Sequence, residues 1–272
     1  MTEARRLAVI TGASSGIGSA FARALAGRGY DLALVARRGE RLQELGDELA
    51  RQFQVSSTPL RADLNDEADV SRVEQFLVDA PQLGLLVNGA GFGSMGRFYE
   101  APPESQASMH RVHVMATMRL THAALRNLTT RGDGGVINVS SVAAYSPHPG
   151  SVSYHATKVW MNSFTEGLYL ELKSAGSRVR VQALCPGFTL TEFHQVLGVK
   201  RDFISGTWWM PAEEVVEASL AGLDADKLFV VPGWRYKLLV ALLRLLPRRV
   251  LHYATLRGPA SLRRERMKTH AD

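Results

Sequence analysis

The sequence predicts the α/β fold class: one doubly wound domain with a mostly parallel sheet and helices on both faces. Short apolar runs, fit for buried strands, alternate with longer segments fit for helices. No internal repeat or long polar linker divides the 272 residues, a length that is ordinary for a single domain of this class. We therefore expect one domain over residues 1–233 and a C-terminal extension, residues 234–272, that is not a separate domain.

The first strand, loop and helix carry the strongest local signal. Leu7 to Ile10 is an apolar run that leads directly into the glycine-rich segment Thr11 to Gly18. Its three glycines let the backbone turn sharply and approach a pyrophosphate, and a helix over Ser19 to Arg28 presents its N-terminus to that anion. A second apolar strand, Asp31 to Ala36, follows. This unit is typical of dinucleotide binding, although the spacing G-x-x-x-G-x-G departs from G-x-G-x-x-G.

The later elements follow from length, apolar content and start signals. Pro211 at a first helical turn, with Glu213 and Glu214 just after it, marks the start of a helix. The other expected elements are a long helix over 105–128, a strand over 135–140, a helix over 152–175, and strands over 179–185 and 228–231.

Tyr154 and Lys158 form the most informative pair of side chains. Positions four apart share a helix face, so the ammonium of Lys158 is expected beside the phenol of Tyr154. A phenol has an ordinary pKa of about 10, and a neighbouring cation favours its ionised form. The pair therefore predicts a tyrosine that acts as an acid or base near neutral pH.

These features resemble the classical short-chain dehydrogenase/reductase family and, less specifically, its DltE-like bacterial subgroup. Four family motifs occur in the family's order over roughly residues 5–232: TGxxxGxG at Thr11 to Gly18, NNAG at Asn88 to Gly91, YxxxK at Tyr154 to Lys158, and PG at Pro186 and Gly187. Gly89 departs from the second position of NNAG. The resemblance implies a Rossmann-type catalytic domain with a seven-stranded sheet that interconverts a carbonyl and an alcohol with a nicotinamide cofactor.

The resemblance also implies the roles of individual residues. Tyr154 would donate the proton, Ser141, thirteen positions earlier, would supply a second hydrogen bond, and Lys158 would lower the pKa of Tyr154 and bind the nicotinamide ribose. The cofactor-binding residues implied are Gly12, Ser14, Ser15, Gly16, Ile17, Gly18, Arg37, Arg38, Asp63, Leu64, Asn88, Ala90, Gly91, Tyr154, Lys158, Pro186, Gly187, Thr189 and Thr191.

His113 stands where the family has a helix asparagine, whose main-chain carbonyl holds a water beside the active-site lysine. Four alternatives stay open: His113 keeps this proton relay as a catalytic residue, weakens it, adds a group that titrates near pH ~6.5, or merely packs on a partly buried helix. With a weakened relay, the protein would be a cofactor-binding sensor or scaffold with impaired turnover.

Cofactor and substrate are suggested by two further segments. The second strand ends without an acidic residue for the ribose hydroxyls of NAD(H), and Arg37 and Arg38 suit a 2′-phosphate, so NADP(H) is expected, with NAD(H) as the alternative. A substrate lid is expected over residues 188–212. Its aromatic and apolar side chains favour an apolar ketone of ketoacyl, steroid-like or aromatic type. They are Phe188, Phe193, Phe203, Trp208, Trp209 and Met210.

Composition limits the alternatives. The single cysteine, Cys185, excludes an internal disulfide, and it is expected to be a small buried residue in a reducing compartment. The N-terminus lacks a hydrophobic signal segment, which predicts a cytoplasmic protein. The eight histidines show no metal-ligand spacing, and no nucleic-acid-binding motif accompanies the net charge of +6. We therefore expect neither a metal nor a nucleic-acid partner.

The positive charge is concentrated in the C-terminal extension. From Arg235 onward the chain has 10 of its 32 Lys and Arg but only 2 of its 26 Asp and Glu. Trp234 to Leu246 is apolar, and spacing places Lys237, Arg244 and Arg248 on one helical face. This helix is expected to cover the substrate pocket or a partner subunit; the alternative is peripheral contact with an anionic membrane. The resemblance implies a homodimer or homotetramer formed through the helices over 105–128 and 152–175.

Overall fold

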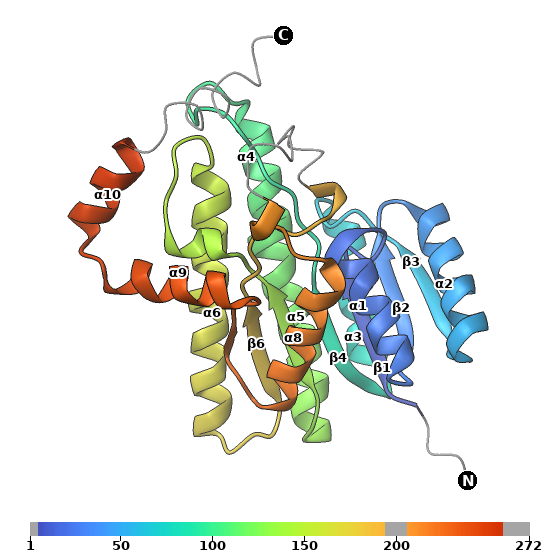
Figure 1. Ribbon diagram of the computed structural model, residues 1–272. Helices are drawn as coiled ribbons and strands as arrows, with labels where there is room; N and C mark the ends of the chain where they lie inside the picture. The colour runs from blue at the N-terminus through green and yellow to red at the C-terminus, as the bar shows by residue number, and fades with distance from the viewer. Residues whose placement is uncertain (1–4, 194–205, 258–272) are drawn as a thin grey trace.

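The computed structural model describes residues 5–193 and 206–257. Within these residues seven strands, all paired in parallel, form one sheet in the order β3-β2-β1-β4-β5-β6-β7 (Figure 1). The strands are β1 (Leu7–Thr11), β2 (Asp31–Ala36), β3 (Ser57–Arg61), β4 (Leu83–Asn88), β5 (Gly135–Val139), β6 (Arg180–Leu184) and β7 (Phe229–Val230). The predicted doubly wound sheet is confirmed.

Helices cover both faces of this sheet. One core joins the strands to α1 (Gly16–Gly27), α2 (Gly39–Phe53) and α8 (Ala212–Asp224), and the other joins them to α3 (Glu67–Asp79), α5 (Thr117–Arg131) and α6 (Val152–Ser174). Val9 and Ile10, adjacent in β1, point into different cores, and both are fully buried. Burial on both faces is why these strands are continuous apolar runs.

The winding reverses between β3 and β4. After β3 at one edge the chain returns to the other side of β1, so β1 lies between β2 and β4. The connections that leave β1 and β4 then diverge, which opens a crevice at the carboxyl ends of these strands. The glycine loop after β1 and residues Gly89 to Gly91 after β4 both lie at this crevice.

The glycine loop is more compact than expected, because α1 begins at Gly16 and not at Ser19. Gly12 has a φ of 71°, in the left-handed region that favours glycine. A Cβ on Gly18 would lie 2.2 Å from the carbonyl oxygen of Gly12. The loop therefore needs glycine at both positions, one for its conformation and the other for its close packing.

The expected long helix over 105–128 is present, and it contains a π-helical segment. It consists of α4 (Pro103–His110), a π-helical segment η1 (Arg111–Ala116) and α5. A π segment accommodates an additional residue per turn and changes the direction of the side chains within it. His113 lies in this segment.

Two helices follow β7. α9 (Trp234–Leu245) lies against the 3-10 turn η2 (Val142–Tyr145), and α10 (Arg248–Arg257) leads away from the body of the protein (Figure 1). Leu246 has an extended conformation and Pro247 follows it, so α9 ends there. The prediction that Arg248 shares a helical face with Lys237 and Arg244 is therefore wrong, because Arg248 begins a new helix.

None of the helices in the described part of the chain is long and apolar enough to cross a lipid bilayer. Residues 258–272 of the C-terminal extension lie outside the described residues.

Candidate active site

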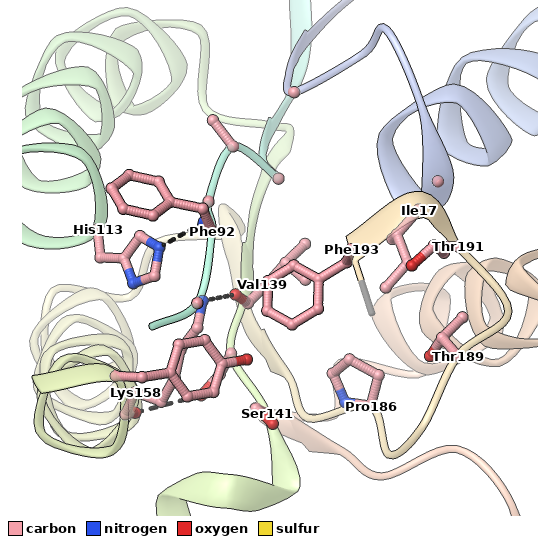
Figure 2. A pocket seen from close by; sticks show the side chains of 18 of the residues that line it. Ile17, Phe92, His113, Val139, Ser141, Lys158, Pro186, Thr189, Thr191 and Phe193 are labelled. Atoms are coloured by element: carbon pink, nitrogen blue, oxygen red, sulfur yellow. Dashed lines mark hydrogen bonds between the residues drawn. The ribbon is translucent and has the colours of Figure 1, made fainter. Parts of the chain in front are cut away.

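A cavity of about 1300 Å³ lies at the carboxyl ends of the central strands. Figure 2 shows side chains from several separate segments around it, including Ile17, Phe92, Ser141, Lys158 and Pro186. The predicted site residues that line it are Gly12, Ser14, Ser15, Gly16, Ile17, Gly18, Arg37, Arg38, Asp63, Leu64, Ala90, Gly91, His113, Ser141, Tyr154, Lys158, Pro186, Gly187, Thr189 and Thr191. The structure thus gathers in one cavity residues that are up to 179 positions apart in the sequence.

Asn88 is the predicted residue that does not belong to this lining. Its side chain is buried, and its amide donates to Thr121 Oγ1 at 3.0 Å and to Asn138 Oδ1 at 2.9 Å. Asn138 in turn donates to Thr165 Oγ1 at 2.9 Å. Asn88 therefore joins β4 to β5 and α5, and its part in cofactor binding stays a prediction.

Ser141, Tyr154 and Lys158 meet on one side of the cavity. Ser141 ends the segment after β5, and its Oγ accepts a hydrogen bond from the Ala143 amide at 3.0 Å. Its hydroxyl lies near the Tyr154 side chain and favours the ionised form of the phenol. One turn further along α6, the ammonium of Lys158 lies 5.6 Å from the centroid of the Tyr154 ring. Tyr154 thus lies near a hydroxyl and a cation.

The charge balance at Tyr154 differs from the sequence-based expectation. Burial raises the pKa of Tyr154 to about 12, and the Ser141 hydroxyl acts in the opposite direction. Burial also lowers the pKa of Lys158 to about 8. We expected Lys158 to lower the pKa of Tyr154. In this structure the loss of hydration on burial has a larger effect on the pKa of each side chain than the other side chain has. Tyr154 is therefore protonated at neutral pH and able to donate.

Lys158 is held by the strand beneath it. Its Nζ donates to the main-chain oxygen of Val139 at 2.7 Å, and the side chain is 5% exposed (Figure 2). In the unfolded chain the ammonium has its ordinary pKa of 10.5, so the folded state binds its proton less tightly. The lysine therefore destabilises the fold at pH values below about 8, where it is charged in both states.

Lys158→Met is expected to reveal how much the buried, charged lysine destabilises the fold. As pH rises from about 8 to about 10.5, the folded lysine loses its proton while the unfolded one keeps it, so wild type gains stability relative to the variant by about 3 kcal/mol. Urea denaturation of both proteins at about pH 7 and about pH 10 measures this change. Lys227→Met, which removes an exposed ammonium, is the control and should leave the pH dependence of wild type in place. A difference between wild type and Lys158→Met that stays constant with pH would contradict the assignment.

His113 is fully buried, and both ring nitrogens have partners. The Phe92 amide donates to Nε2 at 3.0 Å (Figure 2). Nδ1 lies 3.0 Å from Thr157 Oγ1. An amide can only donate, so Nε2 is the unprotonated nitrogen and Nδ1 carries the proton that it donates to Thr157. Thr157 in turn donates to the Tyr154 main-chain oxygen at 2.9 Å. His113 therefore links the segment after β4 to the helix that carries Tyr154 and Lys158.

This environment selects among the alternatives for His113. Burial, and secondarily the positive charge of Lys158, hold the pKa of His113 well below its ordinary value of 6.5. The alternative of a group that titrates near pH 6.5 is thus corrected: the imidazole is neutral, and it packs and hydrogen-bonds within the protein. Gly91 is needed beside it, because a Cβ there would lie 2.7 Å from His113 Nε2.

The other side of the cavity fits a dinucleotide. Gly12, Gly16 and Gly18 form a backbone cradle at the N-terminus of α1, and a Cβ on Gly12 would lie 2.8 Å from the main chain at Gly89 and Ala90. The guanidinium of Arg38 donates to Ser15 Oγ at 2.8 Å and to Ser14 Oγ at 3.0 Å. These donors at a helix N-terminus suit phosphate oxygens. The residues present therefore fit a nicotinamide dinucleotide.

Glu192 is a residue of this region that the sequence did not indicate. Its carboxylate accepts from Arg38 Nη1 at 2.9 Å and from Arg41 Nη1 at 2.8 Å. These two guanidinium groups hold the pKa of Glu192 below its ordinary value. No local pattern identifies such a partner, since Glu192 is 154 positions from Arg38. Glu192 therefore pairs with Arg38, the arginine that the sequence assigned to a 2′-phosphate.

Apolar groups surround the reacting end of the cavity. Phe193, in the segment after β6, points into the cavity (Figure 2). Its ring centroid lies 5.9 Å from that of Tyr154. The cavity wall also includes Phe92, Met95, Phe188, Trp208, Leu239 and Leu243. Of the expected lid over 188–212, residues 194–205, with Phe203, lie outside the described residues. Trp209 and Met210 are described but do not belong to the lining of this cavity.

Tyr236 of α9 was also missed by the sequence prediction. Its hydroxyl accepts from the Phe188 amide at 2.8 Å and donates to the Trp208 main-chain oxygen at 2.6 Å. Gly187 accommodates the ring, because a Cβ there would lie 2.0 Å from it. α9 therefore covers the cavity, as expected for the start of the C-terminal extension.

Cys185 is buried beside this segment, as predicted, and burial raises the pKa of its thiol to about 11.

Among the described residues, no group of histidine, cysteine, aspartate or glutamate side chains could hold a metal ion.

Comparison with known proteins extends this description. A family model described as short chain dehydrogenase matches residues 6–202. The very-long-chain 3-oxoacyl-CoA reductase of Anas platyrhynchos is 30% identical over 193 residues, which are 70% of this chain and 61% of that protein. This chain thus aligns with less than two thirds of that relative's length.

Two further proteins are similar over most of their length. The sulfoacetaldehyde reductase 2 of Chromohalobacter salexigens is 37% identical over 196 residues, which are 69% of this chain and 74% of that protein. The structure of a short-chain dehydrogenase from Sphingobium yanoikuyae in complex with NADPH is 33% identical, with a TM-score of 0.80 over 89% of this chain and 96% of that one.

Proposed function

The chain belongs to the short-chain dehydrogenase family, and we propose that it is an oxidoreductase of carbonyls and alcohols that uses a nicotinamide cofactor, prefers NADP(H) and acts on an apolar substrate. The observation that carries the proposal is the meeting of Ser141, Tyr154 and Lys158 in a cavity whose other end fits a dinucleotide. The three side chains are the proposed catalytic residues.

The protein's part in the chemistry follows from this geometry. The nicotinamide, when bound, supplies or accepts the hydride. During reduction the substrate carbonyl oxygen receives hydrogen bonds from the Tyr154 and Ser141 hydroxyls, and Tyr154 delivers its proton as negative charge develops there. Lys158 places a positive charge beside Tyr154 and stabilises the phenolate that remains. In the oxidation direction the same tyrosine, once ionised, takes the proton of the alcohol.

The proposed preference for NADP(H) rests on Arg38. Its guanidinium lies at the edge of the cradle beside two serine hydroxyls, and the chain has Ala36, Arg37 and Arg38 where an NAD(H)-binding site would have an acidic residue. A guanidinium is suited to a phosphate because it donates two parallel hydrogen bonds. The similar Sphingobium yanoikuyae structure, which holds NADPH, supports this preference.

The proposed apolar substrate rests on the cavity wall and not on the relatives. The two relatives, a very-long-chain 3-oxoacyl-CoA reductase and a sulfoacetaldehyde reductase, do not agree on a substrate class. In this chain the space beside Tyr154 is bounded by Phe193, and Leu239 and Leu243 line the same cavity from α9. A bulky ketone of ketoacyl, steroid-like or aromatic type would bury these side chains from water.

The sensor alternative depended on a defect at His113. The ring is neutral and satisfied by two partners, and Ser141, Tyr154 and Lys158 remain grouped. The sensor alternative is therefore not favoured.

For assembly we propose a homo-oligomer, in which α5 and α6 with the adjoining η1 pair with a second copy. The exposed apolar side chains Met115, Met118, Val159 and Leu170 lie on these helices.

A test of cofactor preference follows from Arg38. Wild type is expected to reduce apolar ketones faster with NADPH than with NADH at equal concentrations. Arg38→Ala is expected to weaken NADPH binding by about 10–100-fold, the value of a charge-assisted hydrogen bond to phosphate, and to leave NADH binding nearly unchanged. Steady-state KM values and fluorescence titration with both cofactors measure these changes.

Glu192→Gln, which removes the ion-pair partner of Arg38, provides the matched control. Removing the carboxylate frees Arg38 and Arg41 from a competing anion, so NADPH binding is expected to tighten while NADH binding stays the same. Wild type that prefers NADH, or an Arg38→Ala variant that loses both cofactors equally, would refute the proposed preference.

A further inference from the structure

α9 has two apolar faces with different surroundings. Tyr236 and Val240 are buried, and Leu239 and Leu243 on the same side line the cavity. On the opposite side, Trp234, Leu238, Leu242 and Leu245 are between 51% and 82% exposed. Their spacing of four, four and three residues places them in one stripe. We call these four residues the outer stripe; it is more apolar surface than one helix normally leaves in water.

Positive charges flank the outer stripe. Arg235 lies on one side of it, and Lys237 and Arg244 lie on the other at helical spacing. α10 continues the pattern, with exposed Val250, Tyr253 and Leu256 beside further arginines. Residues 234–257, which we call the C-terminal arm, contain six Lys and Arg and no Asp or Glu. The arm therefore presents bulky apolar groups within an entirely cationic border.

We propose that the C-terminal arm docks on an anionic lipid surface. Leucine and tryptophan side chains of an interfacial helix enter the boundary between headgroups and acyl chains, while flanking lysine and arginine side chains contact phosphates. Both parts of the arm's surface are then used: the outer stripe enters the lipid, and the border pairs with negative headgroups. The 12 residues of α9 rise about 18 Å, too little to cross a hydrocarbon core of about 30 Å, so the contact is peripheral.

A second copy of the chain is a poorer occupant. A two-fold contact through the arm would place one cationic arm against another, and no acidic side chain within residues 234–257 could offset that repulsion. Figure 1 shows α10 directed away from the sheet and its covering helices, which leaves the arm accessible to an extended surface.

Docking would connect the lipid to the active site. α9 is fastened to the loop after β6 through Tyr236, and its inner face lines the cavity through Leu239 and Leu243. A bilayer on the outer stripe thus lies one helix away from the cavity. An apolar substrate concentrates in the bilayer, so a docked enzyme meets it at high local concentration. This last step rests on the proposed apolar substrate, whereas docking itself does not.

Co-sedimentation of the full chain with vesicles tests the docking. Wild type is expected to sediment with phosphatidylcholine vesicles that contain phosphatidylglycerol and to stay in solution with phosphatidylcholine alone. Added salt should weaken the binding, because part of it is electrostatic. Leu238→Ser/Leu242→Ser/Leu245→Ser is expected to weaken it by at least about 10-fold, as three leucines no longer enter the lipid.

Two control proteins make the result specific. Phe98→Ser/Tyr99→Ser removes exposed apolar groups from the segment before α4 and should sediment like wild type. Arg244→Gln/Arg248→Gln/Arg249→Gln should lose the preference for anionic vesicles. NADPH binding by the arm variants reports an intact fold without using turnover, so failure of docking is separable from failure of the proposed reaction.

The proposal is overturned if wild type stays in solution with anionic vesicles, or if the triple leucine variant binds them as wild type does. It is also overturned if wild type does not bind vesicles and the triple leucine variant has a smaller oligomeric mass than wild type in gel filtration. The outer stripe is then an interface between copies. If docking occurs, wild type should reduce a vesicle-dissolved ketone faster than the triple leucine variant does, while a water-soluble ketone is reduced at equal rates.

Discussion

Tyr154→Phe is expected to lower kcat for ketone reduction by about 10²–10⁴-fold, the usual contribution of one positioned acid. The substitution removes only the hydroxyl. The phenyl ring can keep the contacts that Tyr154 makes with Phe193 and His113, at centroid distances of 5.9 Å each. NADPH affinity is therefore expected to change little, and the loss should appear in kcat. Stopped-flow or steady-state NADPH oxidation, together with fluorescence titration of NADPH, separates the two quantities.

Tyr145→Phe is a matched control for this variant. Tyr145 ends η2, which begins directly after Ser141, and its hydroxyl is 3.7 Å from Cys185 Sγ. It is not assigned to the reaction, so turnover should remain within a few-fold of wild type. Equal loss in the two tyrosine variants, or full activity in Tyr154→Phe, would show that another group supplies the proton.

His113→Ala is expected to destabilise the protein by about 3–5 kcal/mol. The substitution leaves a cavity, and it leaves the Phe92 amide and the Thr157 hydroxyl without the partner that the ring provided. Because the ring ties Thr157 and thereby the start of α6 to the strand side of the cavity, catalytic efficiency should fall as well. Urea denaturation measures the first effect, and kcat/KM for ketone reduction measures the second.

The pH dependence of this loss identifies the protonation state of His113. The folded pKa lies well below 6.5, so the folded ring stays neutral while the unfolded chain gains a proton as pH falls through 6.5. The stabilising contribution of His113 is therefore complete above pH 6.5 and decreases toward acid. The stability difference between wild type and His113→Ala should narrow at about pH 5. A difference that widens in acid would mean that the folded ring is charged. His122→Ala, at an exposed position of α5, should cost no more than about 0.5 kcal/mol at either pH.

Local sequence patterns predicted the elements that depend on near neighbours. Asp31 to Ala36 was placed within its observed bounds, and the helix expected over 152–175 spans Val152–Ser174. Apolar runs fix the strands because each residue there is buried on one face of the sheet or the other, and helical spacing brings Tyr154 and Lys158 together. The π segment inside the helix expected over 105–128 was not predicted, because such a segment adds its extra residue without any signal in composition.

By itself, then, the sequence determined the family, the order of the strands and helices, and the motif residues of the cavity wall, since motifs and periodicity are properties of contiguous residues. Tertiary structure decided the rest. It turned Asn88 into a link between strands, paired Glu192 with Arg38 across 154 positions, and fastened Tyr236 to the loop after β6. It also decided the protonation of Tyr154, Lys158 and His113, because the free energy of a buried charge depends on how much water the whole fold excludes, and no short segment carries that information.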